Sequence, residues 1–156
     1  MAERNCTTAT SCAGFTLIEM IMVVVIVGLM MGIAIPFLRN SSDRGGVTES
    51  AVVISSMHAR AKLAAIQRGR VTRLKMNASQ STMWVTASKT SGRGVDTVGN
   101  VENLSDRFGI TFTTTRDSLT FTPRGIGTES SGTTIVIAKG SAADTITISA
   151  AGRLVH

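Results

Sequence analysis

The sequence predicts an α+β fold in which a long N-terminal helix packs on an antiparallel β-sheet or a small β-sandwich. Three patterns indicate this fold: a charge-free apolar run near the N-terminus, a helical recurrence of apolar residues after it, and alternating threonine-rich segments in the second half. A helix followed by six or seven short strands is the element order of an α+β protein. The 156 residues suffice for one such domain and an additional segment.

The apolar run predicts a membrane-spanning helix. Residues 20–38 are nineteen positions without a charged side chain, and a helix of that length covers about 28 Å, close to the hydrocarbon thickness of a bilayer. The run is too long for the core of a cleaved secretory signal, and the residues from Ile35 to Arg39 form a poor cleavage site. Pro36 removes one helical hydrogen bond, so we expect a kink there.

Glu19 directly precedes this run, and a plain signal anchor would not require a carboxylate at that position. An acidic group costs roughly 2.5 to 3.5 kcal/mol at the centre of a membrane helix and less toward its end. The run itself contains no Lys or Arg that could pair with it. A cut between Gly14 and Phe15 would create a positively charged amine one helical turn from Glu19.

Gly14 followed by Phe15-Thr16-Leu17-Ile18-Glu19 and a long apolar helix resembles the prepilin signature of type IV pilins and type II secretion pseudopilins. The resemblance implies that a prepilin peptidase cleaves after Gly14 and methylates the new N-terminal Phe15. It implies that Glu19 pairs with the Phe15 amine of a neighbouring subunit in a filament, and that Pro36 bends the helix. The chain would then comprise a cleaved leader (1–14), a transmembrane and filament-core helix (15–39) and an extracytoplasmic domain (40–156).

A second helical stretch follows a polar, glycine-bearing segment at residues 40–46. Apolar residues recur at helical spacing from about Val47 to Arg68, and Gly69 is a natural stop. We expect one long helix that is interrupted near Pro36 or Gly45.

Beyond Gly69 the apolar period changes to two, which is typical of antiparallel strands with one solvated face. The alternating pairs are Leu74 and Met76, Met83 and Val85, Ile110 and Phe112, Leu119 and Phe121, Ile135 and Ile137, and Ile146 and Ile148. Residues 88–106 hold three glycines and no clear period, so we expect a long loop there.

The second half of the chain is similar to the GspH/FimT family of minor pseudopilins. The stretches that carry this likeness are Arg60, Ala61, Ala64, Ile66, Arg68 and Gly69 leading into Val71-Thr72, and Asp144 to Ser149 followed by Gly152-Arg153. The resemblance implies a structural subunit of a type II secretion pseudopilus, placed at or near its tip. It further implies a single-pass inner-membrane protein with a periplasmic C-terminal domain, and other pseudopilins or minor pilins as partners.

The sequence shows no catalytic constellation, and we expect neither an enzyme nor a bound metal or cofactor. The two histidines, His58 and His156, have no Cys or carboxylate at metal-ligand spacing. Both cysteines, Cys6 and Cys12, precede the apolar run, so we expect them to leave with the leader.

The formal net charge is +6, and no acidic residue occurs between Glu49 and Asp96. The basic residues of that interval are Arg60, Lys62, Arg68, Arg70, Arg73, Lys75, Lys89 and Arg93. They form either a solvated surface that favours anionic lipid headgroups or a contact surface for DNA phosphates, and could share one face.

A DNA-binding minor pilin acting in natural transformation is therefore the alternative function. Some minor pilins on the FimT side of the family bind DNA through a C-terminal Gly-Arg-x-Arg motif. Gly152 and Arg153 match it, but Val155 stands where the second arginine would be, so only Arg153 carries over and secretion ranks first. A third possibility is an unprocessed single-span protein in which GFTLIE is coincidental.

Overall fold

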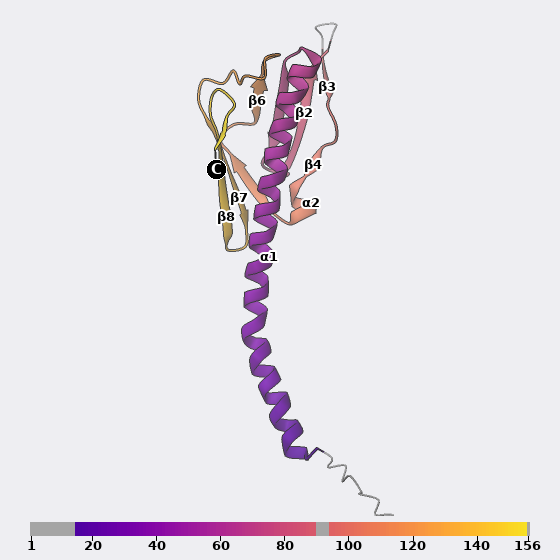
Figure 1. Cartoon of the computed structure of the whole chain (residues 1–156), viewed down its shortest axis with the longest axis vertical. Coiled ribbons are helices and arrows are strands. Elements are labelled where there is room, and N and C mark those ends of the chain that lie inside the picture. Colours follow the sequence, from indigo (N-terminus) through magenta and orange to yellow (C-terminus); the bar gives the residue numbers. More distant parts are fainter. Residues whose placement is uncertain (1–14, 90–93, 156) are drawn as a thin grey trace, which may run out of the picture. The chain divides into compact units, whose positions relative to one another are not determined.

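A computed structural model describes residues 15–89 and 94–155. The described residues contain the long helix α1 (Leu17–Arg68) and one further short helix, α2 (Leu104–Phe108) (Figure 1). The strands are β1 (Thr72–Asn77), β2 (Thr82–Ser88), β3 (Val95–Thr97), β4 (Glu102–Asn103), β5 (Thr111–Thr114), β6 (Ser118–Phe121), β7 (Thr133–Lys139), β8 (Ala142–Ile148) and β9 (Leu154–Val155).

The chain divides into two compact units, one up to Leu38 and one from Arg39 onward. In the first unit every described residue, from Phe15 to Leu38, is exposed. By length and composition α1 could cross a membrane, and it is the one such helix in the part of the chain that the structure describes.

The helix α1 runs from Leu17 to Arg68 without a break, so the expected interruption near Pro36 or Gly45 is wrong. A proline inside a helix removes one hydrogen bond but need not end the helix, and helical residues continue on both sides of Pro36. The neighbouring Gly46 serves packing instead: a Cβ there would lie 3.0 Å from Lys139 Nζ and 3.2 Å from the Phe108 carbonyl oxygen. Glycine therefore allows α1 to approach the end of α2 closely.

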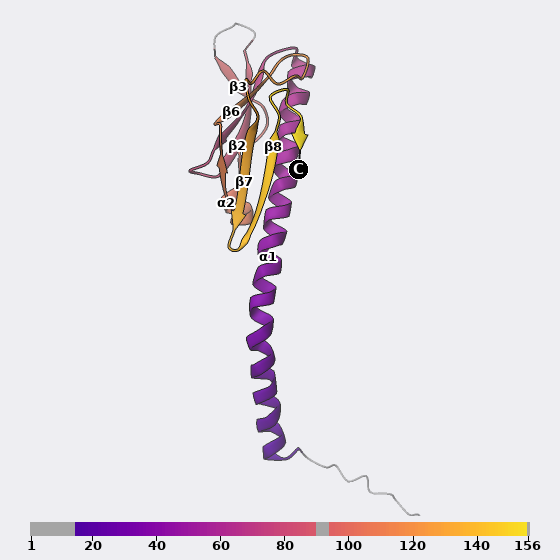
Figure 2. The same ribbon diagram turned by 90° about the vertical axis from the view of Figure 1, so that its left-hand side faces the viewer.

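The second unit contains two antiparallel sheets. Sheet A has the order β3-β2-β1-β6, with β4 also pairing with β2, and sheet B has the order β5-β7-β8-β9. Figure 2 shows β7 and β8 of sheet B side by side. Leu74 of β1 lies opposite Val85 of β2 and Leu119 of β6, so the apolar residues predicted from the alternation share one face. The α+β fold with a long N-terminal helix is thus confirmed.

One face of α1 from Val47 onward packs with both sheets into a single core. Members of this core are Val47, Ala51, Ile54, Met57, Ala61, Ala65, Leu74, Met76, Met83, Val85, Leu104, Ile110, Phe112, Leu119, Phe121, Ile135, Ile137, Ile146 and Ile148. The buried Thr72 hydroxyl donates a hydrogen bond of 2.7 Å to the Ala61 carbonyl oxygen, which ties the first strand to the helix.

The expected long loop at residues 88–106 is wrong in part. It contains the edge strands β3 and β4, both paired with β2, and the start of α2. Asn103 caps α2 by accepting hydrogen bonds from the backbone N–H groups of Ser105 (3.1 Å) and Asp106 (3.2 Å), and Gly109 closes it with φ of 65°. The segment's apolar residues are too few for a periodic pattern, so its strands depend on pairing with β2.

Candidate functional site

The N-terminal motif begins α1 with a capping arrangement. The Thr16 hydroxyl oxygen accepts a hydrogen bond of 3.3 Å from the Glu19 backbone N–H, and the Thr16 carbonyl accepts the first helical bond, from Met20 N–H at 3.2 Å. Thr-x-x-Glu at a helix start is the capping-box pattern, and a carboxylate there is favoured by the helix dipole. Thr16 and Glu19 therefore have a local role in starting the helix, in addition to any role in assembly.

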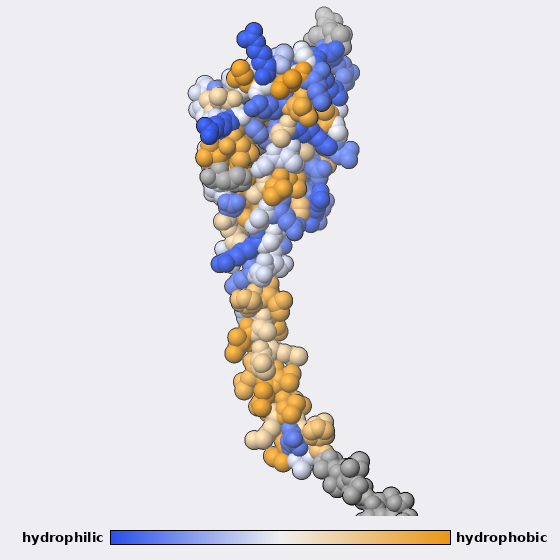
Figure 3. All heavy atoms as spheres, viewed as in Figure 1, coloured by the Kyte–Doolittle hydropathy of each residue, from blue (hydrophilic) through white to orange (hydrophobic). Residues whose placement is uncertain are grey.

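The side chains of Phe15 and Glu19 are exposed, and neither has a hydrogen-bond or ion-pair partner among the described residues. The exposed fraction of Phe15 is 78%, and Glu19 makes no ion pair among the described residues. Gly14, the predicted cleavage position, and the predicted leader (1–14) lie outside the described residues, as do Arg93 and His156. On the face that Figure 3 shows, the residues of α1 up to Leu38 are almost all hydrophobic.

The predicted basic residues lie on separate surfaces of the second unit. Arg73 and Lys75 alternate with the buried Leu74 on β1, so they lie on the face of sheet A that points away from the core. The remaining candidates belong to α1 (Arg60, Lys62, Arg68), to the turn after it (Arg70) and to the β8–β9 turn (Arg153). The expectation that helix and strand cations share one face is therefore wrong, because the β1 cations are on the opposite side of sheet A from α1.

The cations near the end of α1 contact nearby turns. A Cβ at Gly99 would lie 2.9 Å from an Arg60 guanidinium nitrogen, and one at Gly125 would lie 3.2 Å from Lys62 Cγ. Arg68 lies in the last turn of α1, where a cation is favoured by the helix dipole. Arg153 is held through its backbone, whose N–H donates to the Ser149 hydroxyl at 3.0 Å.

His58 is buried against the core. Its ring meets the Phe121 ring edge-on, with centroids 5.3 Å apart, and its Nε2 atom is buried without a hydrogen-bond partner. Burial lowers the pKa of His58 below its usual value, with a smaller contribution from the nearby Lys62 charge, against a backbone hydrogen bond at Gly152 that raises it. Among residues 15–89 and 94–155 there is no group of three or more His, Cys, Asp or Glu that could hold a metal.

A glycine-rich contact beside His58 was not anticipated from the sequence. Gly127 and Gly152 bring the 122–127 turn against the 149–153 turn, and the Gly127 N–H donates to the Ala151 carbonyl at 3.0 Å. A contact between two turns that lie more than twenty residues apart has no local signal in the sequence.

The fold and the N-terminal motif together define a pilin-like protein. Residues 10–35 match the family model of the prokaryotic N-terminal methylation motif, and residues 53–152 match that of the type II transport protein GspH. The second match covers more than half of the chain, which therefore belongs to the GspH family. This family consists of pseudopilin-like structural subunits.

Solved structures with the same fold come from both pilus and secretion systems. The type IV minor pilin FimU of Pseudomonas aeruginosa has a TM-score of 0.57 at 19% identity, over 72% of this chain and 88% of that chain. The minor pseudopilin EpsH of the Vibrio cholerae type 2 secretion system has a TM-score of 0.56 at 15% identity, over 70% of this chain and 94% of that chain. No curated protein matches the sequence. At these identities the structural likeness establishes the fold alone.

Proposed function

We propose that the protein is a minor pseudopilin, a structural subunit at or near the tip of a type II secretion pseudopilus that assists protein export across the outer membrane. The observation that carries the proposal is the GspH match over residues 53–152 on a chain that also carries the methylation motif at residues 10–35. The fold shared with EpsH, itself a minor pseudopilin, is consistent with it. The protein acts by assembly and not by catalysis.

In this proposal the peptidase removes residues 1–14 after Gly14 and methylates Phe15. The helix at residues 15–39 first anchors the subunit in the inner membrane and then joins the filament core, with Pro36 bending it. Residues 40–156 lie in the periplasm and contact other pseudopilins. The exposure of all side chains from Phe15 to Leu38 supports this division, because an apolar helix without internal contacts needs lipid or neighbouring helices.

Glu19 provides the charge that selects the neighbour. Its carboxylate has no partner among the described residues, and the methylated amine of Phe15 from an adjacent subunit would neutralise it in an apolar surrounding. Attraction between opposite charges is stronger in an apolar surrounding, and a carboxylate left unpaired there is costly, so this contact would favour docking in one register.

Two measurements test the proposal: the N-terminal sequence of the mature protein, and the secretion of exported proteins when the gene is deleted. N-terminal sequencing of protein from envelopes of the native host should give methylated phenylalanine, and Gly14→Ala should leave the full-length precursor. Deleting the gene should retain secreted proteins in the periplasm. A mature protein that begins at Met1 would favour the unprocessed single-span alternative, and normal secretion without the gene would exclude the secretion role.

The second candidate function is DNA binding by a type IV minor pilin. The observation that favours it is a set of cations in no ion pair among the described residues, and the fold is also that of the minor pilin FimU. The cations are Arg60, Lys62, Arg68, Arg70, Arg73, Lys75 and Arg153. A salt-dependent mobility shift of duplex DNA, lost in the Arg68→Ala/Arg70→Ala/Arg73→Ala variant, would support it, and no shift at low salt would exclude it.

A further inference from the structure

The outward face of sheet A combines cations with the single tryptophan of the chain. Leu74 and Met76 of β1 point into the core, which leaves Arg73 and Lys75 on the opposite face. Lys75 lies directly across the strand pair from Trp84 of β2, and across the other pair from Ser118 of β6. Residues opposite each other in an antiparallel pair share a face, so these side chains are neighbours.

The strands β1, β2 and β6 of this face carry cations and no carboxylate. Three carboxylates near sheet A are engaged with other cations: Asp96 with Lys89 at 3.4 Å, Glu102 with Arg107 at 3.5 Å, and Glu129 with Arg116 at 2.8 Å. Arg73 and Lys75 take part in no ion pair within the described part of the chain.

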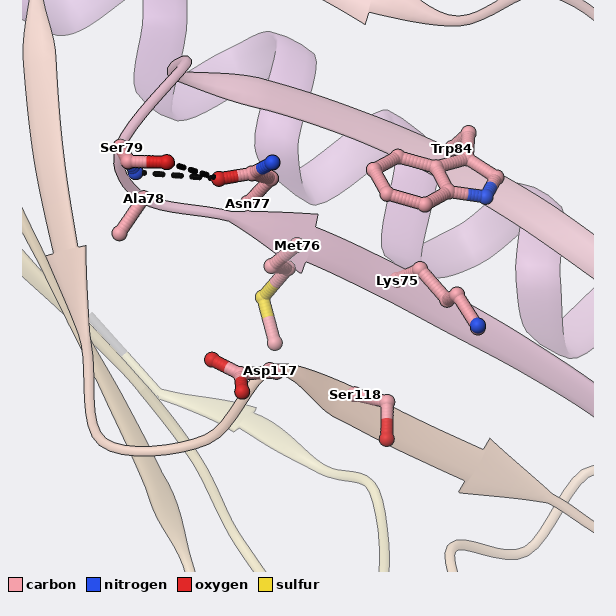
Figure 4. A pocket seen from close by; sticks show the side chains of 8 residues that line it. All are labelled: Lys75, Met76, Asn77, Ala78, Ser79, Trp84, Asp117 and Ser118. Carbon is pink, nitrogen blue, oxygen red and sulfur yellow. Dashed lines mark hydrogen bonds between the residues drawn. The ribbon is translucent and has the colours of Figure 1, made fainter.

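An open groove of about 530 Å³ adjoins these side chains (Figure 4). Trp84 and Lys75 lie toward one end of it, and the β1–β2 turn lies at the other. That turn is held by Asn77, whose side-chain oxygen accepts hydrogen bonds from the Ser79 N–H (3.1 Å) and hydroxyl (2.7 Å). The exposed Asp117 forms part of the lining and is the one carboxylate there.

We propose that Arg73, Lys75, Trp84 and the adjoining groove form the docking surface for an acidic segment of a different pilin-like subunit. Tryptophan and arginine are enriched among the residues that dominate protein interfaces, and a face with more cations than carboxylates favours an anionic partner. A second copy of this chain is disfavoured, because its net charge of +6 would bring like charges together. The proposal rests on the proposed function, since it names the chemistry of the partner in the assembly.

The experiment replaces Trp84 with the photo-crosslinking residue p-benzoylphenylalanine in the full chain, expressed in native-host cells that assemble the filament. After irradiation, mass spectrometry should identify the crosslinked peptide as an acidic stretch of another pilin-like subunit. The matched control carries the same residue at Val136, on an exposed position of β7 in sheet B, and should give at least a tenfold lower yield of that adduct. Ser118→p-benzoylphenylalanine repeats the test from β6 if the Trp84 variant is unstable.

Charge dependence provides the second readout. In the crosslinking background, Arg73→Gln/Lys75→Gln should lower the adduct yield several-fold, and 0.5 M NaCl should do the same to the unsubstituted surface. The docking proposal is overturned if the adduct is a second copy of this chain, a nucleic acid or a neutral or basic peptide, or if no adduct forms in assembled filaments. If the processed protein is absent from filaments altogether, the proposed function fails and this inference fails with it.

Discussion

The two parts of the chain obtain their stability in opposite ways. From Phe15 to Leu38 every residue is exposed, although the segment is apolar throughout except for Thr16 and Glu19. From Arg39 onward the chain buries a core of its own, in which Ile54, Leu74 and Ile137 have no exposed surface. The apolar side chains of the first part therefore need lipid or neighbouring subunits to cover them, whereas those of the second part pack against one another.

This difference implies that one substitution has different consequences in the two parts. A change in the first part should alter anchoring or assembly and leave the folding of the domain intact. A change in the second part should alter the free energy of unfolding before it alters assembly. The substitutions of Glu, Phe and Gly below use the same type of residue in both parts, so that either part can contradict the distinction.

The largest effect is expected at Glu19. Glu19→Ala should leave cleavage after Gly14 intact but reduce incorporation into the filament at least tenfold, because the charge that pairs with a neighbouring amine is lost. Glu19→Gln separates this role from helix capping, since glutamine also completes a capping box but carries no charge. Quantitative immunoblots of purified filaments measure incorporation, and Glu49→Ala is the matched control in the second unit. Normal incorporation of Glu19→Gln would refute the pairing role.

Phe121 and Phe37 offer the same side chain in the two surroundings. Phe121 is 1% exposed and packs against His58, whereas Phe37 is 77% exposed. Phe121→Ala should lower the free energy of unfolding of the domain by about 3 to 5 kcal/mol, and Phe37→Ala should leave it unchanged. Urea unfolding of the full chain in detergent, followed by Trp84 fluorescence, measures both. An equal loss in the two variants would show that the apolar segment contributes to the domain core.

Gly127 and Gly28 provide a similar pair with a smaller effect. A Cβ at Gly127 would lie 2.7 Å from the Ala150 carbonyl oxygen and 2.7 Å from the Gly152 nitrogen, and backbone atoms cannot move aside easily. Gly127→Ala should therefore cost about 1 to 3 kcal/mol of domain stability. At Gly28 a Cβ meets nothing within 4 Å, so Gly28→Ala should leave domain stability unchanged. The same urea titration measures both variants. An unchanged free energy of unfolding in Gly127→Ala would mean that the two turns separate easily.

The sequence predicted much of the fold because its signals are local. Apolar alternation placed Leu74, Val85 and Ile137 correctly on buried faces, and the core face of α1 followed from helical spacing. The interruption near Gly45 was wrong because the reason for Gly46 is close contact with Lys139 and Phe108, almost a hundred and more than sixty residues away respectively. Packing between distant segments leaves no periodic trace in the sequence.

The residues of the candidate site also differ in how far the sequence alone could predict them. Gly14, Phe15 and Glu19 form a short contiguous motif, so the sequence alone identifies them, and their roles stay predictions. The basic residues could be counted but not placed: Arg73 and Arg68 are five positions apart, yet one lies on the outer face of sheet A and the other in the last turn of α1. The sequence could have indicated Trp84 as a neighbour of Lys75 only if the register of β1 and β2 had been known.

The smallest effect concerns pH and again separates the two parts. Burial lowers the pKa of His58 in the folded domain below the value of about 6.5 that it has in the unfolded chain. At a pH below 6.5 the unfolded chain therefore binds a proton at His58 more readily than the folded domain does. The domain should be most stable above pH 6.5 and lose stability as the pH falls toward 5.5, because protonation buries a charge beside Phe121. Urea midpoints across this range measure the loss, and His58→Gln should flatten the dependence. Filament incorporation through Glu19 should not follow the same titration, since a shared dependence would mean that the domain and the apolar helix are coupled through His58.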